Sequence, residues 1–123
     1  MITAERARTV LDYGAGDGEM LLGLLADPRA TEIETVIAFD PEKGFRAEME
    51  RRIGTDPRVT IVGTRQEAAA QLHGRKLDVV SCLGVLEHLP LTEREHFYRF
   101  CDQHLSTGGR CIIDARSRSE EAW

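Results

Sequence analysis

Short apolar runs rich in β-branched residues alternate with longer helix-forming segments, and this alternation limits the fold more than any other feature. Strands are predicted over 9–11, 33–39, 58–62, 77–82 and 110–115, and helices over 19–26, 42–53, 66–72 and 92–105. The last helix is expected to start with a capping box, with Thr92 as N-cap and Glu95 as its partner. Helices that cross over between short strands require a mostly parallel sheet covered on both faces. The pattern predicts an α/β, doubly wound sheet of about five strands.

Composition and charge narrow the class of protein. The chain has 123 residues, 41% hydrophobic and 30% charged, which suits one core, so a single domain over 1–123 is expected. With 16 Lys+Arg against 21 Asp+Glu the net charge is −5, and an acidic chain lacks the basic face that binding to nucleic acid needs. No apolar run of about 18 residues is present, so no membrane-spanning helix is expected.

Cysteine use and the first residues bear on location. Cys82, Cys101 and Cys111 are odd in number and lack a CxxC spacing, a pattern typical of a reduced protein. Residues 1–8 are polar and show no secretory signal. The sequence therefore predicts a cytoplasmic protein.

A glycine cluster, Gly14, Gly16 and Gly18, follows the first predicted strand. Glycines at alternate positions let the backbone turn sharply before a helix and approach a ligand closely. Asp40 ends the second strand about 20 residues further on, where a carboxylate can accept hydrogen bonds from ribose hydroxyls. Together they predict a site for an adenosine-containing cofactor, whereas the glycines alone also fit a tight turn without a ligand.

The charges around the glycines discriminate between cofactors. A nicotinamide dinucleotide fits poorly, because its fingerprint requires glycine where Glu19 stands. Asp12, Asp17 and Glu19 would also repel a pyrophosphate. The loop instead favours a cationic ligand, such as a sulfonium compound with an amino group.

Four segments resemble motifs of the class I S-adenosylmethionine-dependent methyltransferases, in the family's order: residues 10–18, 36–40, 77–89 and 105–113. The resemblance runs from about residue 9 to residue 115. It implies a Rossmann-like core that binds S-adenosylmethionine and transfers its methyl group to a small-molecule acceptor. The alternatives are a non-catalytic S-adenosylmethionine-binding core or interaction module of a larger assembly, an RNA-end ribose methyltransferase and, less favoured, a nucleotide-binding oxidoreductase.

The resemblance also implies which residues bind the cofactor: Asp12, Gly14, Ala15, Gly16, Gly18, Asp40, Pro41, Thr64 and Leu83. Asp12 and the glycine backbone would hold the methionine moiety. Asp40 would bind both ribose hydroxyls, and Pro41 or Glu42 would lie against adenine. Leu83 would lie near the sulfonium. Thr64 stands where the family often has an acidic residue for the adenine amino group, and its hydroxyl can still accept a hydrogen bond.

Glu87 and His88 follow the fourth strand on the ligand side of the sheet. A base is needed only if the acceptor must lose a proton, and these two residues are the catalytic candidates. The alternative is that the pair only caps the segment before Leu89. A metal site built on the pair would require a further carboxylate where Gly84 stands, so no metal is predicted.

The family's catalytic domain usually continues beyond the fifth strand with an antiparallel hairpin, and helices usually precede its first strand. The chain lacks room for both, so the resemblance predicts a domain truncated at both ends, without the C-terminal strand hairpin. The fifth strand would then be an exposed edge, which either pairs with a second copy in a homodimer or is covered by the tail.

Overall fold

The computed structural model describes residues 7–113 and the main chain of 120–122. The strands are β1 (Thr9–Tyr13), β2 (Thr35–Phe39), β3 (Val59–Val62), β4 (Leu77–Cys82), β5 (Leu105–Ile113) and β6 (Glu120–Ala122). The helices are α1 (Glu19–Ala26), α2 (Lys43–Ile53), α3 (Arg65–Ala70) and α4 (Leu91–His104), with a 3₁₀ turn η1 (Leu86–His88). The six strands form one sheet in the order β3-β2-β1-β4-β5-β6, parallel except for β6. The predicted α/β fold, a doubly wound and mostly parallel sheet, is confirmed.

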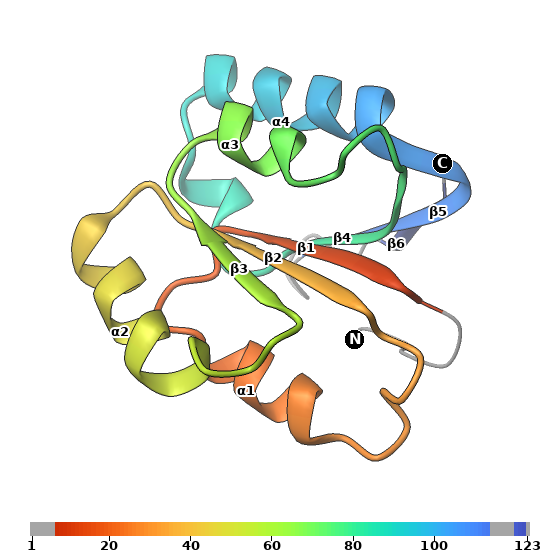
Figure 1. The fold of residues 1–123 in the computed structure, drawn as a ribbon. Coiled ribbons are helices and arrows are strands. Elements are labelled where there is room, and N and C mark those ends of the chain that lie inside the picture. The colour runs from red at the N-terminus through yellow and green to blue at the C-terminus, as the bar shows by residue number, and fades with distance from the viewer. Residues whose placement is uncertain (1–6, 114–119, 123) are drawn as a thin grey trace.

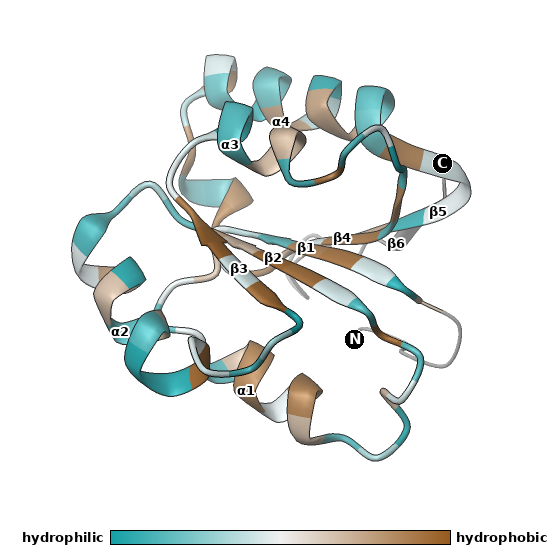
Figure 2. Cartoon of the chain, in the orientation of Figure 1, coloured by the Kyte–Doolittle hydropathy of each residue, from teal (hydrophilic) through white to brown (hydrophobic). Residues whose placement is uncertain are grey.

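Helices cover both faces of this sheet, α3 and α4 on one side and α1 and α2 on the other (Figure 1). Alternate residues of a strand point to opposite faces. In β1, Leu11 and Tyr13 therefore enter the core under α3 and α4, whereas Val10 enters the core above α1 and α2. The strands are apolar along most of their length, as a parallel sheet buried on both faces requires (Figure 2).

The capping box predicted at Thr92 is wrong. Helix α4 begins at Leu91, with Pro90 at the N-cap, because the fixed φ of proline ends the extended segment one residue earlier than expected. The same Thr-x-x-Glu spacing forms a close variant of the capping box at α3, in which the glutamate accepts from the residue before the N-cap. There the Glu67 N–H donates to Thr64 Oγ1 over 3.1 Å, and Glu67 Oε1 accepts from the Gly63 N–H over 3.3 Å.

Strand β5 starts earlier than predicted and is not left as a bare edge. Residues 106–109, which lie outside the predicted strand, belong to β5, where its pairing with β4 shifts register between Leu77 and Val79. Residues 114 and 115 of the predicted strand lie outside the described residues. Over 110–112 the edge is covered by β6, which pairs with these residues and satisfies their edge hydrogen bonds, so coverage by the tail is confirmed there. The homodimer itself stays a prediction.

Within residues 7–113 and 120–122, no helix has both the length and the apolarity to span a membrane.

Candidate functional site

The predicted cofactor-binding residues lie at or just after the carboxyl ends of β1, β2, β3 and β4. Strand β1 lies between β2 and β4, and the chain crosses from one side of β1 to the other between β3 and β4. Ligands of such sheets bind at this reversal of strand order, beyond the carboxyl ends of the strands. The glycine loop, which connects β1 to α1, lies at this point.

Main-chain hydrogen bonds tie the glycine loop to the end of β2. The N–H groups of Gly14 and Ala15 both donate to the Phe39 carbonyl oxygen, over 2.8 and 2.9 Å. Gly14, Gly16 and Gly18 all have positive φ, at 82°, 60° and 84°. L residues rarely adopt this conformation, so the spacing of the glycines is a requirement of the backbone.

The glycines differ in the space around them. A Cβ atom on Gly14 would lie 2.7 Å from Val85 Cγ2, so the loop needs glycine there to pass under the segment after β4. A Cβ atom on Gly16 would meet no described atom within 4 Å. Gly16 therefore presents bare backbone to open space, as a cradle for a ligand requires. This observation fits the cofactor that the sequence motif predicts.

Asp40 holds the loop through its side chain. Its Oδ2 accepts a hydrogen bond from the Gly16 N–H over 2.9 Å, and its Oδ1 accepts from the Glu42 N–H over 2.9 Å. The residue is only 7% exposed. A carboxylate has about four acceptor positions, so capacity for ribose hydroxyls remains. Asp40 thus has a structural task that the sequence did not predict.

Asp12 lies deeper, at 4% exposure, and Ser81 Oγ donates a hydrogen bond to its Oδ1 over 2.9 Å. Burial raises the pKa of Asp12 to about 7, although the hydrogen bond from Ser81 opposes the rise, and the charge of Asp40 adds a smaller increase. An opposite charge nearby favours an ionised carboxylate. A cationic group bound beside Asp12 would therefore lower the pKa of this carboxyl group, so that Asp12 loses its proton near neutral pH.

We expect this burial to appear as a pH-dependent stability. The pKa of Asp12 is raised in the folded state from 3.8 to about 7, so the folded state binds more protons within that interval. Its contribution to stability therefore falls as pH rises from about 4 to 7 and levels off above. The variant Asp12→Asn cannot ionise, so its free energy of unfolding should rise relative to wild type across this window, by about 4 kcal/mol at most. Denaturant unfolding of both proteins from pH 4 to 8 measures this, and a difference independent of pH would contradict it.

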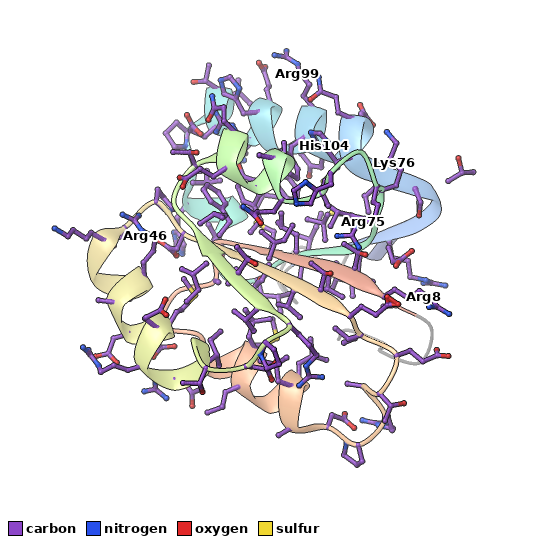
Figure 3. The ribbon with its side chains drawn as sticks, viewed as in Figure 1. Arg8, Arg46, Arg75, Lys76, Arg99 and His104 are labelled. Atoms are coloured by element: carbon purple, nitrogen blue, oxygen red, sulfur yellow. The ribbon has the colours of Figure 1, made fainter. Side chains whose placement is uncertain are left out.

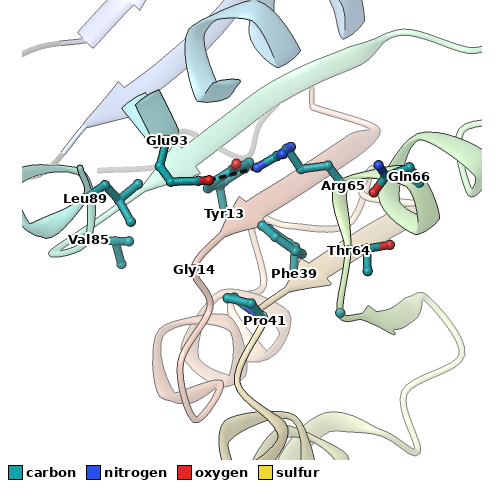
Figure 4. Close-up of a pocket in the computed structure, with 11 residues that line it drawn as sticks. Tyr13, Gly14, Phe39, Pro41, Thr64, Arg65, Gln66, Val85, Leu89 and Glu93 are labelled. Carbon is teal, nitrogen blue, oxygen red and sulfur yellow. Dashed lines mark hydrogen bonds and ion pairs between the residues drawn. The ribbon is translucent and has the colours of Figure 1, made fainter. Parts of the chain in front are cut away.

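A mostly apolar pocket of about 280 Å³ opens beside the glycine loop, and we refer to it as the apolar pocket (Figure 4). Its lining combines aromatic, aliphatic and polar side chains: Tyr13, Gly14, Phe39, Pro41, Gly63, Thr64, Arg65, Gln66, Val85, Leu89 and Glu93. The rings of Tyr13 and Phe39 pack edge to face with centroids 4.8 Å apart. Arg65 Nη1 pairs with Glu93 Oε2 over 3.0 Å. Burial raises the pKa of Tyr13, against a hydrogen bond from Arg65 that lowers it.

The structure brings together only part of the predicted site. Gly14, Pro41 and Thr64 line the pocket, and Gly16 and Asp40 form the adjoining loop contact. Ala15 and Gly18 are buried. Gly18 packs against α2, because a Cβ atom on Gly18 would lie 3.0 Å from Met49 Cγ. Leu83 packs against the core above α1 and α2.

Glu87 and His88 lie on η1 and are not among the residues that line this pocket. The side chain of His88 is 71% exposed, and its Nε2 is 3.7 Å from Glu87 Oε1. The pair lies beside this pocket, whose lining includes Val85 and Leu89 on either side of η1. Among the described residues, no three His, Cys, Asp or Glu side chains are grouped as a metal site.

Several lining residues were not predicted. Tyr13 and Phe39 each end a strand, and the alternation of side chains along a strand could have placed both on the face of α3 and α4. Val85 and Leu89 lie within the motif around β4. Arg65 and Glu93 come from separate helices, and no local pattern indicates that they meet.

The family profile described as "Methyltransferase domain" matches residues 11–111. The chain belongs to this methyltransferase family. The membership confirms the resemblance to the S-adenosylmethionine-dependent methyltransferases, which was based on the motifs alone, and it disfavours an oxidoreductase.

Individual relatives agree with this assignment. The chain is 30% identical over 128 aligned positions to the ubiquinone biosynthesis O-methyltransferase of Escherichia fergusonii, covering 98% of this chain and 50% of the relative. The methyltransferase domain thus spans about half the length of the curated relatives that it matches.

Two solved structures share the fold. An O-methyltransferase family protein from Burkholderia thailandensis superposes with a TM-score of 0.69 at 24% identity, covering 88% of this chain and 32% of that one. PKMT2 from Rickettsia typhi, in complex with AdoHcy, gives 0.70 at 20% identity, covering 89% and 21%.

Proposed function

We propose that this methyltransferase domain binds S-adenosylmethionine and transfers its methyl group to an oxygen atom of a small molecule. The observation that carries the proposal is the glycine loop at the reversal of strand order, with open space at Gly16 and a buried carboxylate at Asp12. The name of the relatives, ubiquinone biosynthesis O-methyltransferase, supports a small-molecule oxygen acceptor.

The residues would share the work of binding as follows. The backbone at Gly14 and Gly16 and the carboxylate of Asp12 would face the methionine part, and Asp40 would accept from the ribose. Pro41 and Thr64, which line the apolar pocket, would take the adenine side. The bound cofactor supplies a methyl group on a positively charged sulfur, so the domain's main task is to hold and align the reactants.

The protonation of the acceptor sets a further requirement. A hydroxyl acceptor must lose its proton to a base, and Glu87 and His88 remain the predicted pair. We expect them to act on an acceptor that lies over η1, beside the apolar pocket. A homodimer, a cytoplasmic location and a single domain over 1–123 also remain predictions.

The alternative from another class is a domain that binds the cofactor without catalysis. Incubation with methyl-labelled S-adenosylmethionine and a pool of phenols and catechols separates the two functions. Label transferred to an acceptor supports the methyltransferase. Saturable binding of S-adenosylhomocysteine without transfer to any acceptor would favour the non-catalytic alternative.

A further inference from the structure

Arg46 lies on α2 (Figure 3). Its side chain bonds to the segment that carries Asp40 and Pro41, two of the predicted cofactor-binding residues. Its Nη1 donates to the main-chain carbonyl oxygens of Asp40 over 3.0 Å and of Pro41 over 2.8 Å. The side chain is half-buried. Hydrogen bonds from a charged donor are stronger than neutral ones, so Arg46 restrains the turn that follows β2.

The same guanidinium lies against the loop that follows β3. A Cβ atom on Gly63 would be 2.9 Å from Arg46 Nη1 and 3.0 Å from Arg46 Cζ, so only glycine lets the two approach this closely. Gly63 leads directly into Thr64 and its capping box on α3. Arg46 thus lies between the loop that carries Pro41 and the loop that carries Thr64.

These two loops form one wall of the apolar pocket, since Pro41, Gly63 and Thr64 all line it. Asp40 extends the connection to the glycine loop, because its carboxylate accepts from the Gly16 N–H over 2.9 Å. The contacts run from Arg46 through the backbone and side chain of Asp40 to Gly16. One half-buried arginine, Arg46, therefore connects three loops that come from distant parts of the sequence.

We propose that Arg46 is a positioning residue for the adenosine half of the cofactor, fixing the Asp40–Pro41 turn against Gly63 and Thr64. The inference rests on the proposed function, because it assigns a role to Arg46 in that same site. A loop already held in its binding conformation loses less conformational freedom when the ligand binds, and the affinity rises accordingly. Arg46 does not touch the pocket, so it acts only through the residues that it holds.

Calorimetric titration with S-adenosylhomocysteine and with 5′-methylthioadenosine, which lacks the amino-acid part, tests the proposal. Arg46→Ala should lower the affinity for both ligands by a similar factor, about 5- to 20-fold, because the lost restraint concerns the adenosine half that both ligands share. Arg46→Lys should recover much of the affinity, since one ammonium can donate to both carbonyls. Arg51→Ala is the matched control, because Arg51 lies on the same helix and pairs with Glu48 at the surface.

A second variant tests the contact with Gly63. The methyl group of Gly63→Ala would displace the guanidinium from the two carbonyls, so this variant should lose a similar factor of affinity for S-adenosylhomocysteine. In an Arg46→Ala background the same change should cost less than about 2-fold, because the displaced group is already gone. If Arg46→Ala does not fold, Gly63→Ala and Arg46→Lys carry the comparison.

Three results would overturn the inference. Equal affinity of wild type and Arg46→Ala for S-adenosylhomocysteine would remove Arg46 from the site and leave the proposed function intact. Additive losses in the double variant would show that Gly63 acts independently of Arg46. No binding by the wild-type protein would overturn the proposed function, and the role of Arg46 with it.

Discussion

The variant Asp40→Ala is expected to lose about 10- to 100-fold in affinity for S-adenosylhomocysteine, as the removal of charge-assisted hydrogen bonds predicts. The carboxylate has two tasks in this account. It would accept from the ribose, and it holds Gly16 and the start of α2 through two hydrogen bonds of 2.9 Å. Calorimetric titration of the variant measures the loss directly.

The control is Asp17→Asn, which removes a negative charge from the same loop. The Asp17 side chain is 41% exposed, its Oδ2 lies 3.8 Å from Arg52 Nη2, and its Oδ1 accepts from the Glu19 N–H over 3.0 Å, a bond that asparagine can also accept. We expect its affinity to stay within about 2-fold of wild type, since charges at the surface are screened. An unchanged dissociation constant in Asp40→Ala, or equal losses in both variants, would contradict the role given to Asp40.

Alanine substitutions at Gly14 and Gly16 should separate stability from binding. Both positions have positive φ, at 82° and 60°, so both variants carry a backbone cost of about 1–2 kcal/mol. Only at Gly14 does the new methyl group also collide, 2.7 Å from Val85 Cγ2. Overpacking adds about 1–3 kcal/mol, so Gly14→Ala should be clearly the less stable variant in denaturant unfolding.

The affinities of the two variants for S-adenosylhomocysteine should show the opposite order, with the larger loss in Gly16→Ala. The methyl group of Gly16→Ala occupies the space that the cofactor needs, so this variant should fold and yet lose at least about 10-fold in affinity for S-adenosylhomocysteine. Adding Val85→Ala to Gly14→Ala removes the colliding atoms and should restore the steric part of the stability. Equal stabilities of the two glycine variants, or full binding by Gly16→Ala, would contradict this assignment.

Much of the fold could be predicted because strand and helix signals are local. The bounds of α1 and β4 match the prediction at both ends, since a continuous helix-forming run stops at Asp27-Pro28 and an apolar run spans 77–82. The helix starts were harder. Thr64 and Thr92 begin identical Thr-x-x-Glu patterns, but only Thr64 caps a helix, because Pro90 decides where α4 begins.

The site could be predicted where residues follow strands and not where side chains cross between elements. Gly14 and Asp40 were found from their positions after β1 and β2. The contacts of Arg46 could not be found in this way, because its partners are carbonyl groups, which every residue carries. The pairing of Arg65 with Glu93 depends on how α3 and α4 pack, which a sequence pattern does not specify.

The glycine loop is expected to bind S-adenosylhomocysteine, the product form of a sulfonium cofactor. The most direct measurement is calorimetric titration of the protein with S-adenosylhomocysteine at pH 7, with NAD as the control ligand. We expect saturable binding of S-adenosylhomocysteine and no heat of binding from NAD, for which Glu19 and the acidic loop are unsuited. A heat of binding from NAD, or no heat of binding from either ligand, would contradict this expectation.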